Sequence, residues 1–148
     1  MNATESFADN LKSNSNGLGL TEEDTIAFLR SMSRYAVSYG LAMGLKNAGS
    51  IVQRVSDFTE FSVNEQCVAY SECSTFASFI KQGKPVFHIE YPDDVRTMDR
   101  AAGEEYCSNR DNAQRSAGFS TVLKNMDLNG FVRYCDGGLA TTATVAEQ

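Results

Sequence analysis

The chain has 148 residues, of which 42% are hydrophobic and 22% charged, the composition of one globular domain rather than of a disordered segment. Its net charge of −6 argues against a nucleic-acid partner, which requires basic surfaces, but is compatible with a cationic polymer as ligand or with an acidic surface that only keeps the protein soluble. Because no stretch approaches the roughly 20 apolar residues of a membrane span, we expect no membrane partner.

The four cysteines form no CxxC pair, and His88 is the only histidine, so the sequence gives little support for a zinc site. We therefore predict no metal and no cofactor. The even number permits two disulfides in an oxidising compartment. Five residues separate Cys67 from Cys73, which suits a small local loop and would leave Cys107 with Cys135. Free buried cysteines are the alternative.

The first predicted helix follows a polar start and a loop. Residues 1–9 contain no apolar signal-peptide segment, and residues 11–19 are rich in Ser, Asn and Gly, which is typical of a loop. Thr21 can cap a helix with three acidic residues in its first turn. Apolar and small residues recur from Ile26 at helical spacing, and Gly40 is a natural stop.

A helix followed by a short apolar strand then recurs along the chain. The predicted strands occupy residues 41–46, 60–64, 86–90 and 119–123. The intervening helices lie around Ile51 to Val55, around Phe76 to Gly83, and between about Gly103 and Ala117. Strands this short and apolar indicate buried parallel strands of an α/β protein.

The end of the chain is predicted to contain little further structure. Leu128, Phe131 and Val132 have the spacing of one last helical turn before Cys135. From Asp136 onward the residues are small and polar, which favours a disordered tail.

All four predicted strands end in polar residues: Lys46 and Asn47, Asn64 and Glu65, Glu90 and Tyr91, and Lys124 and Asn125. In parallel α/β folds, ligands bind at the carboxyl edge of the sheet, because side chains from several strands converge there. One polar strand end can simply mark the emergence into solvent, but four in succession favour a site.

The residue types at these ends suit chemistry on a hydroxylated substrate. Glu65 and Glu90 are candidates for acid, base or nucleophile, since glycoside hydrolysis usually needs two carboxylates. Lys46 and Lys124 would lower a neighbouring carboxyl pKa or bind sugar hydroxyls. His88 lies two residues before Glu90, on the same side of the strand, where we expect it to support Glu90. We predict substrate contacts from seven of these residues: Lys46, Asn47, Asn64, His88, Glu90, Tyr91 and Lys124.

Four segments of the chain resemble glycoside hydrolase family 114 in order and spacing. They are GLKNAG at 44–49, FSVNEQCVAYSEC at 61–73, GKPVFHIEY at 83–91 and GFSTVLKNMDL at 118–128. VNEQC followed by FHIEY is the specific part, and the resemblance runs from about Ser6 to Cys135.

The resemblance implies a TIM-type (β/α)8 barrel of which this chain supplies strands five to eight. It also implies a secreted enzyme that hydrolyses α-1,4-linked galactosamine polymers, with Glu65 as one catalytic carboxylate and with Cys67–Cys73 and Cys107–Cys135 disulfides. We expect residues 1–135 to form this partial barrel domain and residues 136–148 to form the disordered tail.

The chain departs from the family pattern at its start. The second catalytic residue of the family is an Asp in a DPDN-like motif directly before Ser6, where this chain has Met1 to Glu5. We therefore expect a fragment that is inactive alone. The alternatives are a non-catalytic half-barrel that binds carbohydrate or associates with itself through open sheet edges, and a small α/β protein of unrelated function.

Overall fold

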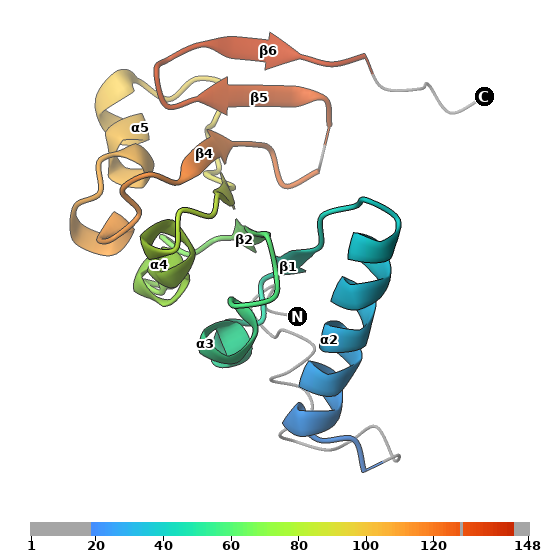
Figure 1. The fold of residues 1–148 in the computed structure, drawn as a ribbon. Coiled ribbons are helices and arrows are strands. Elements are labelled where there is room, and N and C mark those ends of the chain that lie inside the picture. The colour runs from blue at the N-terminus through green and yellow to red at the C-terminus, as the bar shows by residue number, and fades with distance from the viewer. Residues whose placement is uncertain (1–18, 128, 144–148) are drawn as a thin grey trace.

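The computed structural model describes residues 19–127 and 129–143, so the expectations for the polar start and most of the first loop lie outside the described residues. The fold alternates helices with strands of one sheet (Figure 1). The strands are β1 (Gly44–Lys46), β2 (Phe61–Glu65), β3 (Val86–Glu90), β4 (Ser120–Leu123), β5 (Phe131–Tyr134) and β6 (Leu139–Thr141). The helices are α2 (Glu22–Ser38), η1 (Gly49–Ile51), α3 (Val52–Val55), α4 (Cys73–Lys81), α5 (Arg100–Cys107) and η2 (Asp111–Ala113).

The sheet has the strand order β1-β2-β3-β4-β5-β6. Strands β1 to β4 pair in parallel, which confirms the predicted βα units, and β5 and β6 add an antiparallel hairpin. The register places Glu65 of β2 opposite Ile89 of β3. The carboxyl ends of the four parallel strands therefore lie along one edge of the sheet.

Helix α2 begins as its sequence predicts. The Thr21 side chain accepts a hydrogen bond from the Asp24 amide, and the Asp24 carboxylate accepts one from the Thr21 amide, which forms a capping box. Ile26 and Ser33 are buried, while the residues between them are partly or fully exposed. At the other end Gly40 adopts a φ of +69°, which favours glycine and ends the helix.

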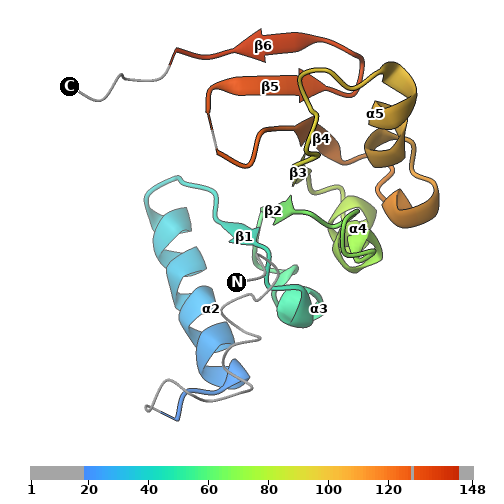
Figure 2. The same cartoon turned by 180° about the vertical axis from the view of Figure 1, so that it is seen from behind.

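Among the residues that the structure describes, helices cover one face of the sheet and leave the other open. On β2 and β3 the buried positions alternate with partly exposed ones. The buried hydrophobic residues Leu45 of β1 and Val86 of β3 join the same core as Val52 of α3 and Phe76 and Phe79 of α4. Figures 1 and 2 show α3 and α4 beside the parallel strands, with the hairpin at the far end of the sheet.

The described sheet does not close on itself. Within residues 19–127 and 129–143, β1 pairs only with β2, and β6 pairs only with β5. An open, mostly parallel α/β sheet of this kind is the architecture of half a TIM-type barrel, as predicted. No helix in the described ranges has the length and apolar character to cross a membrane.

The structure corrects the prediction for the end of the chain. Phe131 and Val132 belong to strand β5, not to a helical turn, and Leu128 lies outside the described residues. The amide of Phe131 donates to the side chain of Asn129, and that of Asn129 donates to Asp127, so this polar turn starts a strand. Phe131 then packs against Leu123. Three apolar residues are too short a window to separate the two periodicities.

The predicted disordered tail also contains structure. Residues 139–141 form β6, which pairs with β5 around a turn in which Gly137 has a φ of +92°. The amide of Tyr134 donates to the carbonyl of Gly138 across this turn. An Asp-Gly pair between two strands is a hairpin signal that the small, polar composition concealed. The domain boundary at residue 135 stays a prediction.

The predicted helix between 103 and 117 is also placed differently. Helix α5 starts at Arg100, because the Asp99 side chain accepts a hydrogen bond from the Ala102 amide and caps it. It ends at Cys107, and positive φ angles at Asn109 and Asp111 then break the helix. A short 3-10 turn replaces its predicted second half.

Candidate active site

Lys46, Glu65, Tyr91 and Lys124 lie on the open face of the sheet. In the observed register Lys46 is opposite Val63, two residues before Glu65, and Ile89 is two residues before Tyr91. Because side chains two residues apart on a strand share a face, these residues point to the side that the helices leave open. The carboxyl edge thus brings together side chains from neighbouring strands, as the sequence predicts.

Glu65 is the centre of this group. Its Oε2 forms an ion pair with Lys46 and accepts a hydrogen bond from the side-chain amide of Asn47 at 3.4 Å. Its Oε1 accepts a hydrogen bond from the Tyr91 hydroxyl at 2.8 Å. The Glu65 side chain is 19% exposed and that of Lys46 is 60% exposed, so the carboxylate is held firmly but reaches the surface.

These contacts favour the ionised carboxylate. Partial burial by itself raises the pKa of Glu65, but the hydrogen bonds from Lys46 and Tyr91 and the charge of Lys46 outweigh it and lower that pKa below its usual value. Burial and the hydrogen bond to Glu65 raise the pKa of Tyr91 well above its usual value. Glu65 is therefore an anion at neutral pH, and Tyr91 is its proton donor in the hydrogen bond.

Asn47 fixes the backbone at the same point. Its side-chain oxygen accepts a hydrogen bond from the amide of Glu65 at 2.9 Å, and its own backbone adopts a φ of +51°. Asparagine tolerates this left-handed conformation better than most residues. A pocket of about 310 Å³ lies beside it. Its lining consists of Asn47, Ala48, Gly49, Ser50, Glu72, Thr75 and Phe76.

Asn64, His88 and Glu90 do not join this site. They alternate with the open-face positions of β2 and β3 and point toward the helices, with 0%, 0% and 1% exposure. The sequence correctly predicts that His88 and Glu90 share a side of β3, since His88 Nε2 lies 2.8 Å from Glu90 Oε1. The sequence does not show that His88 and Glu90 lie on the opposite side of the sheet from Glu65. This is determined by the register, which pairs Glu65 with Ile89.

Lys124 has a structural contact. Its ammonium group donates to the backbone carbonyls of Asn129 at 3.3 Å and Phe131 at 3.0 Å. It therefore holds the connection between β4 and β5. Lys46 thus lies beside a carboxylate, whereas Lys124 contacts backbone carbonyls.

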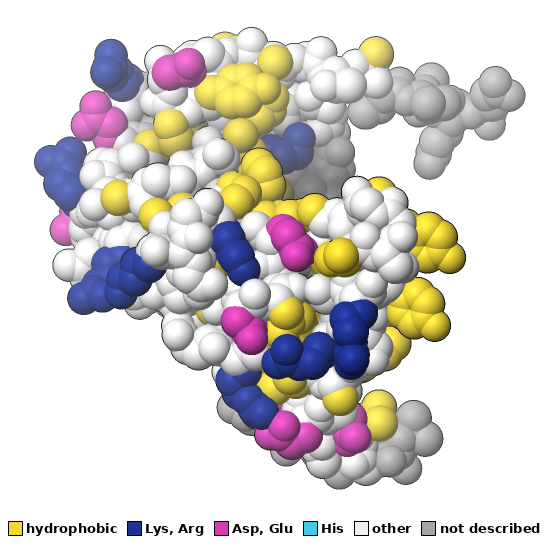
Figure 3. Space-filling view, in the orientation of Figure 1, with side chains coloured by type: hydrophobic (Ala, Val, Ile, Leu, Met, Phe, Trp, Pro, Cys, Tyr) yellow, Lys and Arg dark blue, Asp and Glu magenta, His cyan; other side chains and the backbone are white. Residues whose placement is uncertain are grey.

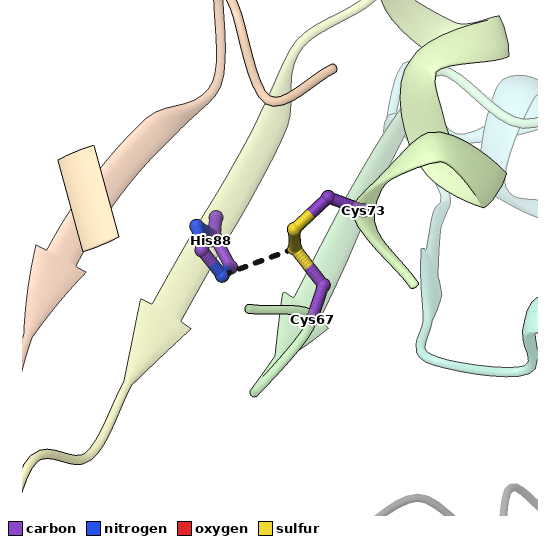
Figure 4. A group of neighbouring side chains, drawn as sticks. All are labelled: Cys67, Cys73 and His88. Atoms are coloured by element: carbon purple, nitrogen blue, oxygen red, sulfur yellow. Dashed lines mark hydrogen bonds between the residues drawn. A yellow bond between two sulfur atoms is a disulfide. The ribbon is translucent and has the colours of Figure 1, made fainter. Parts of the chain in front are cut away.

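Both predicted disulfides are present, Cys67–Cys73 and Cys107–Cys135, with Cα atoms 4.7 Å and 5.7 Å apart. Cys67, Cys73 and His88 form a compact cluster whose potential metal-ligating atoms all lie within 4.8 Å of one another (Figure 4). Metal binding by cysteine requires a thiolate. Because the two sulfurs are bonded to each other, this cluster does not offer thiolate ligands.

The face shown in Figure 3 carries charged side chains of both signs. Figure 3 shows lysine and arginine side chains interspersed with acidic ones on the face that it presents, and hydrophobic side chains along the α2 side. Arg54 pairs with both Glu22 and Glu23.

Comparisons with known proteins agree on a single family. A family model described as glycoside-hydrolase family GH114 matches residues 5–140. The crystal structure of Aspergillus fumigatus Ega3 in complex with galactosamine is similar, with 44% sequence identity and a TM-score of 0.69. The match covers 86% of this chain and 52% of that one, so the chain spans about half the length of the solved structure. A search of curated proteins found no match.

Proposed function

Since this chain belongs to glycoside-hydrolase family GH114, we propose that the whole protein hydrolyses α-1,4-linked galactosamine polymers, with Glu65 as one catalytic carboxylate. The observation that carries the proposal is the position of Glu65 at the carboxyl end of a parallel strand, where active sites of TIM-type barrels lie. Of the four parallel strand ends described, this one alone presents a carboxylate on the open face.

The galactosamine complex of the similar solved structure supports the choice of substrate. Galactosamine units carry amino groups, and a polymer of them is cationic, which matches the net charge of −6. We propose that Lys46, Asn47 and Tyr91, which contact Glu65, also border the sugar. We further propose secretion of the whole protein, because two disulfides are typical of an oxidising compartment.

The ion pair between Glu65 and Lys46 is expected whether Glu65 is catalytic or only stabilises the end of the strand. An activity assay therefore has to distinguish these two roles. The chain can be joined to the first half of a full-length family member and assayed for cleavage of a galactosamine polymer. Glu65→Gln should lower turnover between about a hundredfold and ten-thousandfold, the usual contribution of a catalytic acid or base.

Glu60 provides a matched control for this assay. Glu60 directly precedes β2, at the end of the strand opposite to Glu65. Its carboxylate accepts a hydrogen bond from the Met43 amide at 2.9 Å. Glu60→Gln should keep near-normal turnover. Near-normal turnover by a folded Glu65→Gln variant would show that the assignment is wrong.

A second candidate, a non-catalytic half-barrel that binds carbohydrate or itself, has one observation in its favour. In the described ranges β1 and β6 each have only one neighbouring strand, and such edges invite pairing. Sedimentation of the 148-residue chain separates the two candidates. A dimer that binds the polymer without cleaving it favours the second, and cleavage by the joined protein favours the first.

A further inference from the structure

The carboxylate of Glu90 is buried on the helix side of the sheet and takes no part in the proposed chemistry. Its Oε1 accepts a hydrogen bond from the backbone amide of Val68 at 2.6 Å and lies 2.8 Å from His88 Nε2. The other ring nitrogen of His88, Nδ1, lies 3.0 Å from the Thr121 hydroxyl. Thr121 is on β4, so one polar chain runs from β4 through β3 to Val68.

Val68 belongs to the loop that directly follows Glu65. The loop turns at Gln66, which has a φ of +64°, a conformation that costs energy for a residue other than glycine. Such a conformation persists only where the surroundings fix it. Here the Gln66 amide donates to the carbonyl of Ile89, the Cys67–Cys73 disulfide ties the loop to α4, and Glu90 holds Val68.

We propose that Glu90 is a positioning residue, which fixes the loop after β2 through Val68 and thereby holds Glu65 in contact with Lys46 and Tyr91. The proposal rests on the proposed function for its catalytic consequence, but the positioning itself is a property of this chain. Figure 4 shows how closely His88 of β3 approaches the disulfide at the base of this loop.

The chemistry of the contact explains why a carboxylate stands in a buried position. A backbone amide that is left without its acceptor in the core is costly, and Glu90 Oε1 is the acceptor of the Val68 amide. The Val68 amide donates to Glu90 Oε1, and a His88 tautomer with its hydrogen on Nε2 donates to the same oxygen and accepts from the Thr121 hydroxyl at Nδ1. The loop therefore has one defined position relative to β3.

The test uses the 148-residue chain itself and measures the titration of the Glu65 carboxylate, which reports on its contacts with Lys46 and Tyr91. Carbon-13 labelling of the glutamate carboxyls allows Glu65 to be titrated by NMR, and hydrogen exchange reports on the Val68 amide. Glu90→Ala should raise the pKa of Glu65 toward its usual value and accelerate exchange at Val68 roughly tenfold to hundredfold, since the buried Val68 amide loses its acceptor. Glu90→Gln should keep both close to wild type, because its amide oxygen still accepts.

Glu60→Ala is the matched control, since it removes a carboxylate that also accepts a backbone hydrogen bond beside β2. It should leave the titration of Glu65 unchanged. If Glu90→Ala does not fold, Glu90→Asp decides, because its shorter side chain no longer reaches Val68. An unchanged Glu65 titration in the folded Glu90 variant, or an equal shift in Glu60→Ala, would overturn the proposal.

In the joined enzyme, Glu90→Ala should lower kcat more than it changes KM, since Glu65 is misplaced while the sugar contacts remain. A different result, full turnover by Glu65→Gln, would reject the proposed function. The NMR result does not depend on turnover. A Glu65 displaced in Glu90→Ala together with an active Glu65→Gln enzyme would reject the function and retain the positioning role.

Discussion

Tyr91 donates its hydroxyl to Glu65 Oε1 at 2.8 Å, so the ends of β2 and β3 share a hydrogen bond. Lys46, at the end of β1, contacts the other oxygen of the same carboxylate. Three consecutive parallel strands thus contribute one side chain each to a single group. Because strands are rigid elements, the three strand ends place these side chains beside one another, and the loop that Glu90 contacts at Val68 starts directly after Glu65.

Replacing Tyr91 by Phe should raise the pKa of Glu65, because the hydroxyl stabilises the ionised carboxylate. The ring and its packing remain, so the fold should be unaffected. Carboxyl NMR titration measures the change. Tyr39→Phe is the control, since Tyr39 is 77% exposed and should leave Glu65 as it is. An unchanged Glu65 titration in Tyr91→Phe would contradict the hydrogen bond.

Replacing Lys46 by Met should raise the pKa of Glu65 by more than Tyr91→Phe does, since Lys46 supplies both a hydrogen bond and a charge. High salt should reduce the difference between wild type and variant, because the lysine side chain is 60% exposed and its charge is screened. Lys81→Met, on the exposed end of α4, serves as the surface control. Equal titration of Glu65 in both lysine variants would count against the ion pair.

The stability of the chain should depend on Glu65 in the acid range. The pKa of Glu65 is lower in the folded state than its ordinary value of 4.5, so the unfolded chain binds more protons between the two values. The contribution of Glu65 is therefore present above about pH 4.5 and is lost as the pH falls through the folded value. Urea unfolding from pH 7 to pH 3 should show the difference between wild type and Glu65→Gln shrinking at the acid end. A difference that stays constant with pH would contradict the depressed pKa.

The parallel strands were predictable because each is a short apolar run followed by a polar pair. The strands predicted at 60–64 and 86–90 agree with the observed β2 and β3 to within one residue. The Thr21 cap and the stop at Gly40 were equally local features. These elements are determined by residues within a few positions of each other, which is why the sequence alone sufficed.

The faces of the strands were not predictable in the same way. Glu65 and Glu90 both end a strand, and only the register that pairs Glu65 with Ile89 places their side chains on opposite sides of the sheet. Register depends on packing between distant segments, here α4 against β2 and β3. The strand β5 was missed for a similar reason, since Phe131 is buried in a cluster with Val95, Met98 and Leu123, which come from other segments.

The two disulfides should differ in how readily they are reduced. Cys67 and Cys73 are 0% and 1% exposed, whereas Cys107 is partly exposed and Cys135 is exposed. Because a thiolate has to reach the sulfur that it attacks, a mild reductant should open Cys107–Cys135 first. Cys107–Cys135 closes a sequence separation of 28 residues, and Cys67–Cys73 one of 6 residues. On chain entropy alone, loss of the first bridge should lower the unfolding free energy by about 4 kcal/mol and loss of the second by about 2 kcal/mol. Alkylation at increasing reductant concentration, followed by peptide mass mapping, should label Cys107 and Cys135 while Cys67 and Cys73 remain bonded. Urea unfolding of the chain with only Cys107–Cys135 reduced should show the larger of these two losses of unfolding free energy, about 4 kcal/mol. Labelling of Cys67 or Cys73 first would mean that the loop after Glu65 opens more easily than its buried contacts with Glu90 and His88 allow.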